Sequence, residues 1–521
     1  MTDELSVFQR YLSENAWMWR RLSPEPKADA PVILVDLMVD HPQYYLLNLV
    51  VAKYLQRLSG ARLIGFADNR KHTKVFLAAR SFGVETVHAV NDVAAEALAG
   101  DLPAYAARLR PLQGAALRRA VLDLDADGLP IGDLVYDTYL RANKCATIET
   151  CSNELLLELS LGLNTARFMR DVLDRLPHIE AAVVGHDCYV LYGILCRLAE
   201  RRGADVHLVS QMKFAASVQR YSAAPADERV RMRVCHDKFA ALLNGDRERA
   251  IACGRALVAG RMDGRNDRRA GKMGGFDPQK PMVSLPALFG RAEGSRSDRP
   301  ILCIMASTLA DAPHANARNV YDDQYVWLIE TLEIASQMPN VDWAIKLHPF
   351  TGLYMNRSHV DAVVTRYVEG APNMRLLRET VNTRSLLGAI DGLITPWGTA
   401  GLEFATQGVP VVTAGNTFYS GLGFTADART VAEYRAAIAA LPDRRQSAEA
   451  VARACVAAFL AFDGMLCDCS LLPDVEAIPW KTYDEGALWQ EATERLAAYR
   501  PNDDPLWQRI ERYQAAGAFS I

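Results

Sequence analysis

Short apolar runs alternate with helical patterns along the first half of the chain. The runs with the apolar character of buried strands are 31–39 ("PVILVDLMV"), 61–68, 84–90, 179–187 ("IEAAVVGHD") and 204–210. Between them, 44–58 and 189–203 have apolar residues at helical spacing, and the second helix is closed by Gly203. Strands separated by helices of this length predict βαβ units and a parallel sheet.

The same rhythm starts again after residue 300. Five further runs have the character of strands: 301–307, 341–349 ("VDWAIKLHP"), 373–379, 390–396 and 409–415. Helical patterns occupy 321–338 and 398–408. A stretch of Gly, Arg, Ser, Asp and Pro at 290–300 separates the two series and reads as a linker. We therefore predict an α/β fold with two doubly wound, Rossmann-like domains that face each other across a cleft.

Three segments follow from this division. Residues 1–298 form the first domain, 299–475 the second, and 476–521 a helical tail that crosses back onto the first. A helical, Arg-rich insertion near 225–280 interrupts the first domain. It is either a solvated helical hairpin with a loop or a basic flap over an anionic substrate.

Length and charge narrow the possible functions. A chain of 521 residues is too long for one hydrophobic core, and its 58 basic and 62 acidic residues give a net charge of −4. This balance offers no general attraction for nucleic acid, so any anion site must be local. The ten cysteines include no CxxC pair, which favours reduced thiols. No run approaches about 18–20 uncharged apolar residues, and the N-terminus lacks the apolar core of a secretory signal. A cytoplasmic protein is expected.

Ligands of open α/β sheets bind beyond the carboxyl ends of the strands, so residues that directly follow strands are the candidates for a site. In "TPWGTAGLEFATQGVPVV" (395–412), Gly398 and Thr399 open a helix whose N-terminus suits a phosphate. Thr395 and Thr399 can donate hydrogen bonds, and Glu403 could accept them from a ribose diol. The alternative is that Thr399 only caps the helix and Glu403 is solvated.

The strand 341–349 ends in a cation, an imidazole and a proline. Lys346 and His348 lie two residues apart and thus on one face of the strand, and Pro349 ends it. A cation and an imidazole beside a helix N-terminus predict a phosphate site. An isolated His is otherwise more often structural.

Two further loops follow strands of the second domain. The first, 307–314, supplies Ser307, Thr308, Asp311 and His314 as donors and a carboxylate. The second, "GNTFYSGLGFT" (415–425), carries side chains that could flank a base or a sugar. These are Asn416, Phe418 and Tyr419. Gly-rich loops, however, often only turn the chain.

The order of these motifs resembles bacterial capsule polysaccharide biosynthesis proteins, the Kdo-transferase-like enzymes of the KpsC/LipA and KpsS/LipB type with a GT-B glycosyltransferase fold. Their pattern has a K-x-HP strand end, a Ser/Thr-Gly-Glu helix and a Gly-rich aromatic loop. The matching residues here are Lys346, His348, Pro349, Thr395, Gly398, Thr399, Glu403, Gly415, Phe418, Tyr419, Gly421, Gly423 and Thr425. The resemblance covers roughly 300–430. Val409 replaces a usual lysine, and 422–424 differ from the family's W-G-L.

The resemblance implies a nucleotide-binding second domain. The HP motif is also similar to that of CMP-sialic acid transferases and CDP-glycerol transferases, in which the His contacts the phosphate of the cytidine nucleotide. A CMP- or CDP-activated donor is therefore implied. GT-B transferases generally use a helix N-terminus and basic residues in place of a metal, so no metal and no further cofactor are expected. The "DLD" at 123–125 is read as turn chemistry.

In enzymes of this fold the first domain mostly binds the acceptor and carries the catalytic base or nucleophile. The candidates here are the Asp and His residues at predicted strand ends: Asp40, His41, Asp133, Asp137, His186 and Asp187. A carboxylate can serve as general base or as nucleophile, and a paired imidazole can hold it or shuttle its proton. Asp187 and Asp40 rank first. Arg141 could neutralise an acidic acceptor or donor. Each Asp could instead be a capping or turn residue.

Together these observations predict a glycosyltransferase of surface polysaccharide synthesis. It would move Kdo or a similar acidic sugar from a cytidine-activated donor to a polysaccharide or lipid-linked glycan, at the inner face of the inner membrane or in a capsule assembly complex. One alternative is a CDP-glycerol-type polyol-phosphate transferase or a sugar-nucleotide epimerase. The other is a non-catalytic, nucleotide-sugar-binding scaffold of a capsule assembly complex.

Overall fold

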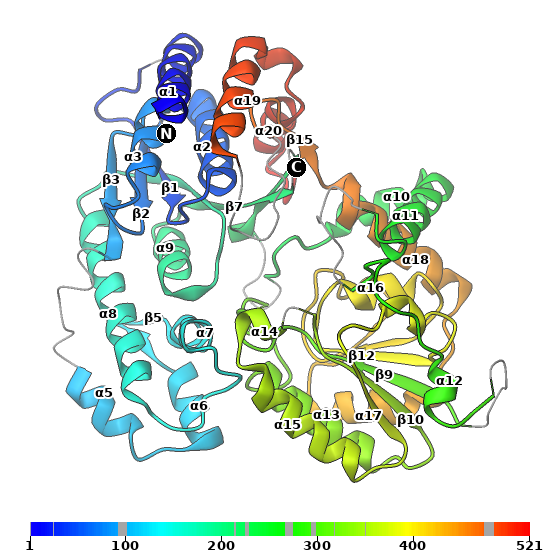
Figure 1. Cartoon of the computed structure of the whole chain (residues 1–521). Helices are drawn as coiled ribbons and strands as arrows, with labels where there is room; N and C mark the ends of the chain where they lie inside the picture. Colours follow the sequence, from blue (N-terminus) through cyan, green and yellow to red (C-terminus); the bar gives the residue numbers. More distant parts are fainter. Residues whose placement is uncertain are drawn as a thin grey trace.

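The structure is a computed structural model that describes most of the chain. The described residues are 2–23, 25–91, 102–212, 215–223, 229–265, 275–292, 299–316, 318–349, 351–473 and 484–521. Part of the predicted insertion (266–274), most of the predicted linker (293–298) and the start of the predicted tail (476–483) lie outside these ranges. The two lobes are visible in Figure 1, one in blue to cyan and the other in green to yellow.

The first lobe is built on a seven-stranded sheet with the order β15-β8-β7-β6-β1-β2-β3. Its strands are β1 (Val32–Leu37), β2 (Arg62–Ala67), β3 (Thr86–Ala89), β6 (Ile179–Val184), β7 (Asp205–Met212), β8 (Ala215–Arg220) and β15 (Cys467–Asp468). The five strands from β3 to β7 pair in parallel, whereas β8 is antiparallel to both of its neighbours. Numbered along the chain, the five parallel strands of this sheet therefore have the order 3-2-1-4-5.

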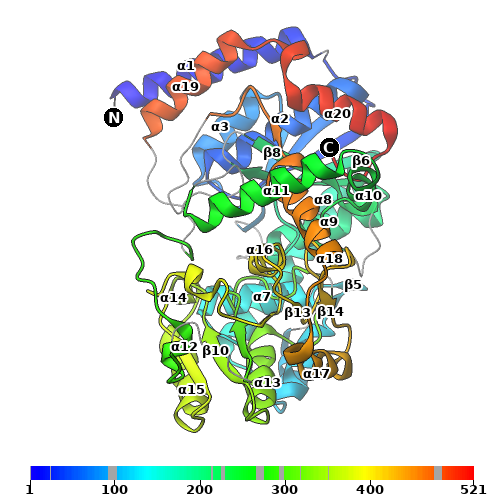
Figure 2. The same ribbon diagram turned by 90° about the vertical axis from the view of Figure 1, so that its right-hand side faces the viewer.

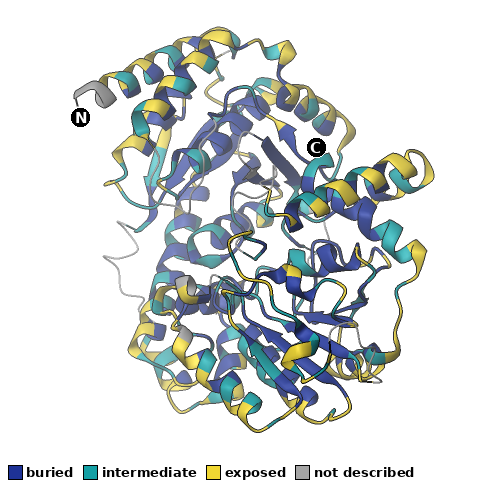
Figure 3. Cartoon of the chain, turned by 45° about the vertical axis from the view of Figure 1, so that its right-hand side comes forward, coloured by how far each residue is buried: buried dark blue, intermediate teal, exposed yellow. Residues whose placement is uncertain are grey.

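Helices cover both faces of this sheet. They include α2 (Pro42–Ser59), α3 (Thr73–Ser81), α7 (Gly132–Asn143), α8 (Asn153–Leu173) and α9 (Tyr189–Arg201). Val32 and Leu34 of β1 pack with α8 and α9, while Ile33 and Val35 pack with α2 and α3. Every residue of β1 is buried because successive side chains point to opposite faces and both faces are covered. Figure 3 shows the strands as the buried interior of each lobe.

Two smaller helices and a hairpin also lie in the connection from β3 to β6. They are α5 (Leu102–Leu109), α6 (Gly114–Leu122), β4 (Asp125–Ala126) and β5 (Leu129–Pro130). Outside this connection, α1 (Thr2–Leu22) stands at the start of the chain and η1 (Tyr221–Ala223) follows β8. Asp125 Oδ1 accepts a hydrogen bond of 2.8 Å from Gly128 N in the β4–β5 turn. The "DLD" stretch thus serves a turn.

The second lobe is built on a six-stranded parallel sheet with the order β11-β10-β9-β12-β13-β14. The strands are β9 (Ile301–Met305), β10 (Asp342–Lys346), β11 (Met374–Leu377), β12 (Gly392–Thr395), β13 (Val411–Thr413) and β14 (Ala426–Asp427). Numbered along the chain, this is 3-2-1-4-5-6, the order of a complete Rossmann fold. The predicted α/β fold with two doubly wound halves is confirmed.

Helices also cover both faces of the second sheet. They are α13 (Gln324–Ser336), α14 (Thr351–Tyr354), α15 (Arg357–Glu369), η3 (Thr383–Leu386), α16 (Thr399–Ala405), α17 (Val431–Ala440), η4 (Leu441–Asp443), α18 (Ala448–Phe459) and η5 (Leu460–Gly464). Ile304 of β9 packs with α13, and Cys303 packs with α16 and α18 on the other face.

The insertion is attached to the second lobe. Its helices are α10 (His236–Asn244), α11 (Arg247–Met262) and the short α12 (Leu285–Leu288). Helix α11 lies against α18 so closely that a Cβ on Gly254 would come within 1.8 Å of the Cys455 carbonyl oxygen. The insertion is therefore packed on the second sheet's helical layer, although it follows the first sheet in the chain.

The chain returns to the first lobe through β15, which pairs with β8, so the crossing takes place before residue 476. Helices α19 (Glu485–Ala498) and α20 (Pro505–Ala516) then pack on α1 and α2, with η6 (Pro501–Asp503) between them. Figure 2 shows α1 and α19 side by side along one edge of the molecule. The Phe8 and Trp489 rings are 4.6 Å apart, and Tyr54 donates to Asp504. Among the described helices, none is both long and apolar enough to cross a bilayer.

Candidate functional site

The carboxyl edges of the two sheets face each other, and the loops that follow β6 and β9 meet. Tyr189 of the first lobe donates through its hydroxyl to Asp311 of the second, at 2.8 Å. Arg141 of α7 donates to the same carboxylate at 2.6 Å. Tyr189 and Ala312 have φ values of +61° and +49°, in the left-handed region that residues with a side chain seldom adopt. Such strain persists where surrounding contacts enforce it and is common at functional sites.

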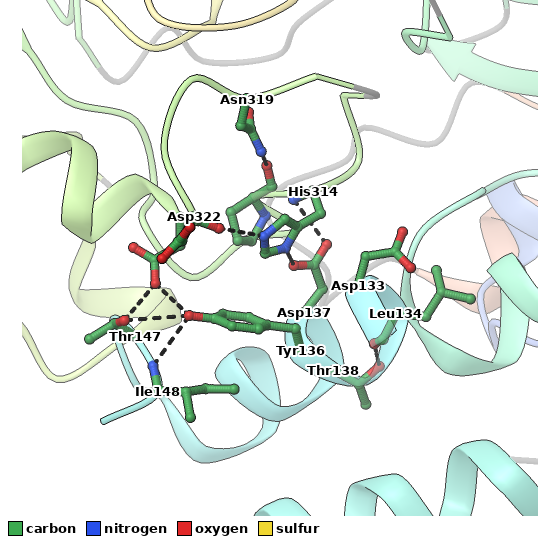
Figure 4. A network of polar contacts seen from close by, with 12 residues as sticks. Asp133, Leu134, Tyr136, Asp137, Thr138, Thr147, Ile148, His314, Asn319 and Asp322 are labelled. Carbon is green, nitrogen blue, oxygen red and sulfur yellow. Dashed lines mark hydrogen bonds and ion pairs between the residues drawn. The ribbon is translucent and has the colours of Figure 1, made fainter. Parts of the chain in front are cut away.

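A second set of contacts between the lobes surrounds His314, as Figure 4 shows. His314 Nδ1 lies 2.6 Å from Asp137 Oδ1, and its Nε2 lies 2.7 Å from the Asp322 carbonyl oxygen. Nearby, the Tyr136 hydroxyl donates to Asp323 at 2.6 Å. Burial lowers the pKa of His314, but the charge and hydrogen bond of Asp137 outweigh burial and raise the pKa to about 9. The imidazole is therefore protonated and paired with a buried carboxylate.

This arrangement corrects the sequence-based interpretation of Asp133 and Asp137. Both lie on α7 rather than at a strand end. Their spacing of four residues places them on one helix face, where Asp133 pairs with Arg197 and Asp137 with His314. Arg141, expected to neutralise a substrate, shares the helix and pairs with Asp311, which was itself a predicted nucleotide ligand.

In the second lobe the strand order reverses between β9 and β12, and this switch point is where ligands of such folds bind. Ser307 follows β9, and Trp397 follows β12. Ser307 Oγ and Trp397 Nε1 are buried atoms with no hydrogen-bond partner in the described part of the chain. A buried polar atom without a partner costs about 1–3 kcal/mol, so these two are suited to receive a ligand.

Three basic side chains gather at the carboxyl end of the neighbouring strand β10. Lys346 ends β10, His348 follows it, and Lys280 comes from the insertion. Burial and, to a smaller extent, the charge of Lys280 lower the pKa of Lys346 to about 8 and that of His348 to about 4. Lys346 Nζ donates to the Val381 carbonyl oxygen at 2.8 Å, and Lys280 Nζ to that of Glu379 at 2.9 Å. The repulsion among these groups would be relieved by a bound anion.

Around α16 the structure separates the predicted ligands from one another. Gly398 precedes this seven-residue helix with φ +116°, and Thr399 is its first residue and half-buried. Thr395 is buried and donates to the Trp397 carbonyl oxygen at 3.0 Å. Glu403 is 2% exposed and paired at 3.0 Å with Arg261, which is equally buried. The carboxylate predicted to meet a ribose thus has a buried partner from α11, and it is not solvated either.

The aromatic loop is packed rather than open. Tyr419 is 1% exposed and its hydroxyl donates to the Gly398 carbonyl oxygen at 2.9 Å; Phe418 lies in the same core. Asn416 is buried and accepts from Arg318 at 2.6 Å. These buried positions do not fit the prediction that the three side chains flank a base. Burying the two aromatic rings in the apolar core is more favourable than exposing them at a binding site. Of the three, Tyr419 holds the turn before α16 through the Gly398 carbonyl oxygen.

The remaining predicted residues of this lobe stay near the switch point. Thr308 and Pro349 are half-buried in the loops after β9 and β10. The Thr308 carbonyl oxygen accepts from Asp311 N at 3.1 Å, and that of His348 accepts from Thr351 N at 3.0 Å. Both loops are therefore tight turns, which place their side chains without long flexible connections.

The first lobe has its own switch point, between β1 and β6, and it is filled by protein groups. Asp36 of β1 accepts from the Tyr44 hydroxyl through Oδ2, and the same oxygen accepts from Gly185 N at 3.1 Å. His186 Nδ1 lies 3.0 Å from the Tyr44 oxygen, and the two rings are stacked 5.1 Å apart. Burial raises the pKa of Asp36 to about 6.

Of the other predicted catalytic residues, Asp40 is exposed after β1 and His41 is the N-cap of α2. His41 Nδ1 accepts from Gln43 N at 3.3 Å, the ordinary role of a capping residue. Asp187 is buried and hydrogen-bonded to Tyr221, and burial raises its pKa. His186 thus contacts Tyr44 and is linked to Asp36 through the Tyr44 hydroxyl.

A cavity of about 1080 Å³ lies beside α7 and α9 and extends to the loop that precedes α13. Asp137, Asp187, Tyr221, Arg197 and His314 are among its lining residues. Three predicted catalytic carboxylates, those of Asp133, Asp137 and Asp187, therefore line one cavity to which both lobes contribute. Within the described ranges, no three His, Cys, Asp or Glu side chains are arranged to hold a metal ion.

Four residues of these two sites were missed by sequence reasoning: Asp36, Tyr44, Lys280 and Trp397. Asp36 was hidden inside an apolar run, where a carboxylate is itself a signal because burying it needs compensating partners. Trp397 stands within a quoted motif, directly after a strand. Nothing in the sequence indicated that Tyr44 or Lys280 would reach these sites.

Residues 323–460 match the family model described as capsule polysaccharide biosynthesis protein. This match confirms the resemblance that the motifs indicated, for a segment of the second lobe. Among curated proteins no sequence matches the chain.

Solved structures give distant similarities. The chain is 14% identical to Thermosulfurimonas dismutans KpsC, beta Kdo 2,4 transferase, over 55% of this chain and 79% of that one, with a TM-score of 0.29. It is 12% identical to the beta Kdo 2,7 transferase of KpsC from the same organism, over 64% and 89%, with a TM-score of 0.30. The chain is 10% identical to UDP-GlcNAc 2-epimerase from Neisseria meningitidis, over 90% of this chain and 98% of that one, with a TM-score of 0.24.

Proposed function

We propose that the protein is a glycosyltransferase of surface polysaccharide synthesis, with a cytidine-activated sugar, Kdo or a similar acidic sugar, as donor. The acceptor is a growing polysaccharide or a lipid-linked glycan. The observation that carries the proposal is the group of Lys280, Lys346 and His348 beside the β9–β12 switch point, within and next to the segment that matches the capsule family.

The three basic groups are suited to the phosphate of a nucleotide. A phosphate placed among them gains charge-assisted hydrogen bonds and removes their mutual repulsion. During transfer the bond between sugar and phosphate breaks and negative charge grows on the departing phosphate. Cations held in a partly buried site stabilise that charge more strongly than they would in water. In other transferases a metal ion stabilises the charge of the departing phosphate. We therefore propose a metal-independent reaction.

Two unpartnered donors support a position for the rest of the nucleotide. Ser307 Oγ and Trp397 Nε1 lie on the two sides of the switch point and have no partner among the described residues. They can donate to ribose, base or phosphate oxygens, and the Trp397 ring offers a surface for stacking. The acceptor would then enter from the first lobe, whose carboxyl edge faces this site through Tyr189 and Asp311.

Nucleotide binding is the first test. Thermal unfolding with CMP, CDP, UDP and GDP should show stabilisation by the cytidine nucleotides, because a ligand at 100 times its Kd stabilises the native state by about 2.7 kcal/mol. Stabilisation by UDP alone would disprove the cytidine assignment.

Product analysis is the second test. Incubation with CMP-Kdo, CDP-glycerol and UDP-sugars, with and without glycan acceptors, should yield a lengthened glycan from CMP-Kdo. A polyol phosphate product, or an epimerised nucleotide sugar without acceptor, would reassign the reaction. Tight nucleotide binding with no turnover of any donor would make the chain a binding scaffold.

A further inference from the structure

The switch point of the first lobe holds a chain of three side chains that runs from the sheet to its carboxyl edge. Asp36 lies in β1 and is fully buried, Tyr44 lies in the first turn of α2, and His186 follows β6. Asp36 Oδ1 accepts from Met38 N at 3.0 Å, while Oδ2 accepts from Gly185 N at 3.1 Å and from the Tyr44 hydroxyl. The carboxylate is thus held in one orientation by two backbone donors.

These contacts determine where the protons lie. A tyrosine hydroxyl has one proton, and that of Tyr44 is donated to Asp36. The Tyr44 oxygen can therefore only accept from His186 Nδ1, which lies 3.0 Å away. A neutral imidazole has a single N–H, so Nε2 of His186 is left with its lone pair free of a proton.

The surroundings keep the imidazole neutral and the rings in place. Burial lowers the pKa of His186 well below its usual value, and the nearby charges of Arg231 and Arg141 lower it further. The Tyr44 ring packs directly over Gly185, where a Cβ would come within 2.4 Å of the ring. On the other side, the Tyr192 ring of α9 lies 5.1 Å from the His186 ring.

We propose that Asp36 and Tyr44 are positioning residues that fix His186 as the Nδ1–H tautomer, so that its Nε2 accepts the proton of the attacking acceptor hydroxyl. This inference rests on the proposed function and names the base of that reaction. The acceptor O–H bond breaks and its proton passes to Nε2. The acceptor oxygen bonds to the anomeric carbon of the donor sugar, and the bond from that carbon to the phosphate oxygen breaks, leaving its electron pair on the departing nucleotide. The imidazolium then releases its proton to water.

His186 fits this task better than the two carboxylates ranked first from the sequence. Asp187 is buried against Tyr221, and Asp40 lies outside the network. His186 is half-buried at the edge that faces the second lobe, three residues before Tyr189, which reaches Asp311. An imidazole that has one nitrogen engaged and the other free to accept a proton is the usual geometry of a histidine general base.

The tautomer can be observed directly in the whole protein. Long-range ¹H–¹⁵N spectra at pH 7.5 should show the His186 side chain as Nδ1–H with unprotonated Nε2, the signal being assigned by its loss in His186→Gln. In Tyr44→Phe the ring stack stays while the hydroxyl is gone, and the signal should move toward the Nε2–H tautomer. A wild-type Nε2–H tautomer, or no change in Tyr44→Phe, would overturn the inference whether or not transfer is detected.

A matched variant separates positioning from stability. Tyr54 is also a buried tyrosine of α2 whose hydroxyl donates to a carboxylate, that of Asp504, remote from the edge. Tyr54→Phe should cost similar stability and leave both the His186 tautomer and kcat unchanged. His186→Gln should lower kcat at least a hundredfold, and Tyr44→Phe about tenfold or more with KM unchanged, while nucleotide binding persists. Full kcat in both His186→Gln and Tyr44→Phe would disprove this inference and leave the proposed function intact. Absence of nucleotide binding would disprove the proposed function.

Discussion

His314 Nδ1 of the second lobe lies 2.6 Å from Asp137 Oδ1 of the first; the Asp137 side chain is buried and that of His314 is 11% exposed. The two residues are distant in the chain, yet their contact joins α7 to the loop between β9 and α13. A buried pair of this kind orients its neighbours but stabilises the protein only while both partners are present. This contact is one of several that join the lobes, together with those of Tyr189 to Asp311 and Tyr136 to Asp323.

His314→Gln removes the cation and leaves the Asp137 carboxylate buried without its charged partner. We expect a loss of about 3–5 kcal/mol in the free energy of unfolding, measured by urea denaturation. The double variant Asp137→Asn, His314→Gln should recover part of that loss. Arg170→Gln, which removes an exposed pair with Asp127, is the control and should cost less than about 1 kcal/mol. Additive losses in the double variant would contradict a coupled pair.

The same pair predicts a dependence of stability on pH. The pKa of His314 is about 9 in the folded protein, above its usual 6.5, so the folded state holds a proton that the unfolded state releases between these values. Stability from this group is complete below about pH 6.5 and is lost as the pH rises through 9, by roughly 3 kcal/mol in total. The difference in stability between wild type and His314→Gln should shrink over that window, and a constant difference would refute the charged state assigned to His314.

Arg261 and Glu403 form a second buried pair, with the guanidinium 4.1 Å from the Phe462 ring centroid. Glu403→Gln should lower the free energy of unfolding by about 3–5 kcal/mol, because the Arg261 charge is left without its partner. Replacing both residues, Arg261→Met with Glu403→Leu, should restore most of it. Calorimetric titration of the double variant with CMP should give a nearly unchanged Kd. A large loss of CMP affinity in the double variant would instead support the prediction from the sequence that Glu403 binds the ribose.

Lys280 tests whether the basic group binds phosphate. Lys280→Met removes one of the two lysine charges of this group, so the pKa of His348 should rise from about 4, which an NMR titration of His348 can follow. The affinity for CMP or CDP should fall about tenfold and depend less on salt. The control is Lys71→Met, an exposed lysine of the first lobe, which should alter neither. Unchanged nucleotide affinity in Lys280→Met would show that Lys280 of the insertion does not contribute to the nucleotide site.

Gly398 stands at φ +116° and ψ 169°, a conformation that is nearly exclusive to glycine. A Cβ there would meet no atom within 4 Å, so the cost of Gly398→Ala is one of backbone strain alone, about 1–3 kcal/mol. Thermal unfolding should show this loss, and CMP affinity should fall because the turn carrying Trp397 is displaced. Gly352→Ala, which also has open space but an ordinary backbone, should leave both measurements unchanged.

The sequence by itself determined the α/β fold and the places where ligands can bind. Apolar runs of strand length separated by helical spacing are local features, and they survive in the structure because each buried strand is covered on both faces. Lys346, His348, Ser307 and Gly398 all lie at or directly after strand ends, as predicted. Neighbouring residues in the chain determine where a strand ends. The positions of these residues at strand ends could therefore be predicted from the sequence.

Only the tertiary structure decided which side chains meet. Asp36 and Gly185 are 149 positions apart, and Arg261 and Glu403 are 142 apart, and no periodicity connects such pairs. The sheet order brings β1 beside β6, so Asp36 and Tyr44 reach His186, while the packing of α11 on α18 gives Glu403 a buried arginine. Asp137 lies on a helix and not at the predicted strand end, and the meeting of the two lobes pairs it with His314. Burial and partner together set the charge of each group, and both arise only when distant segments pack.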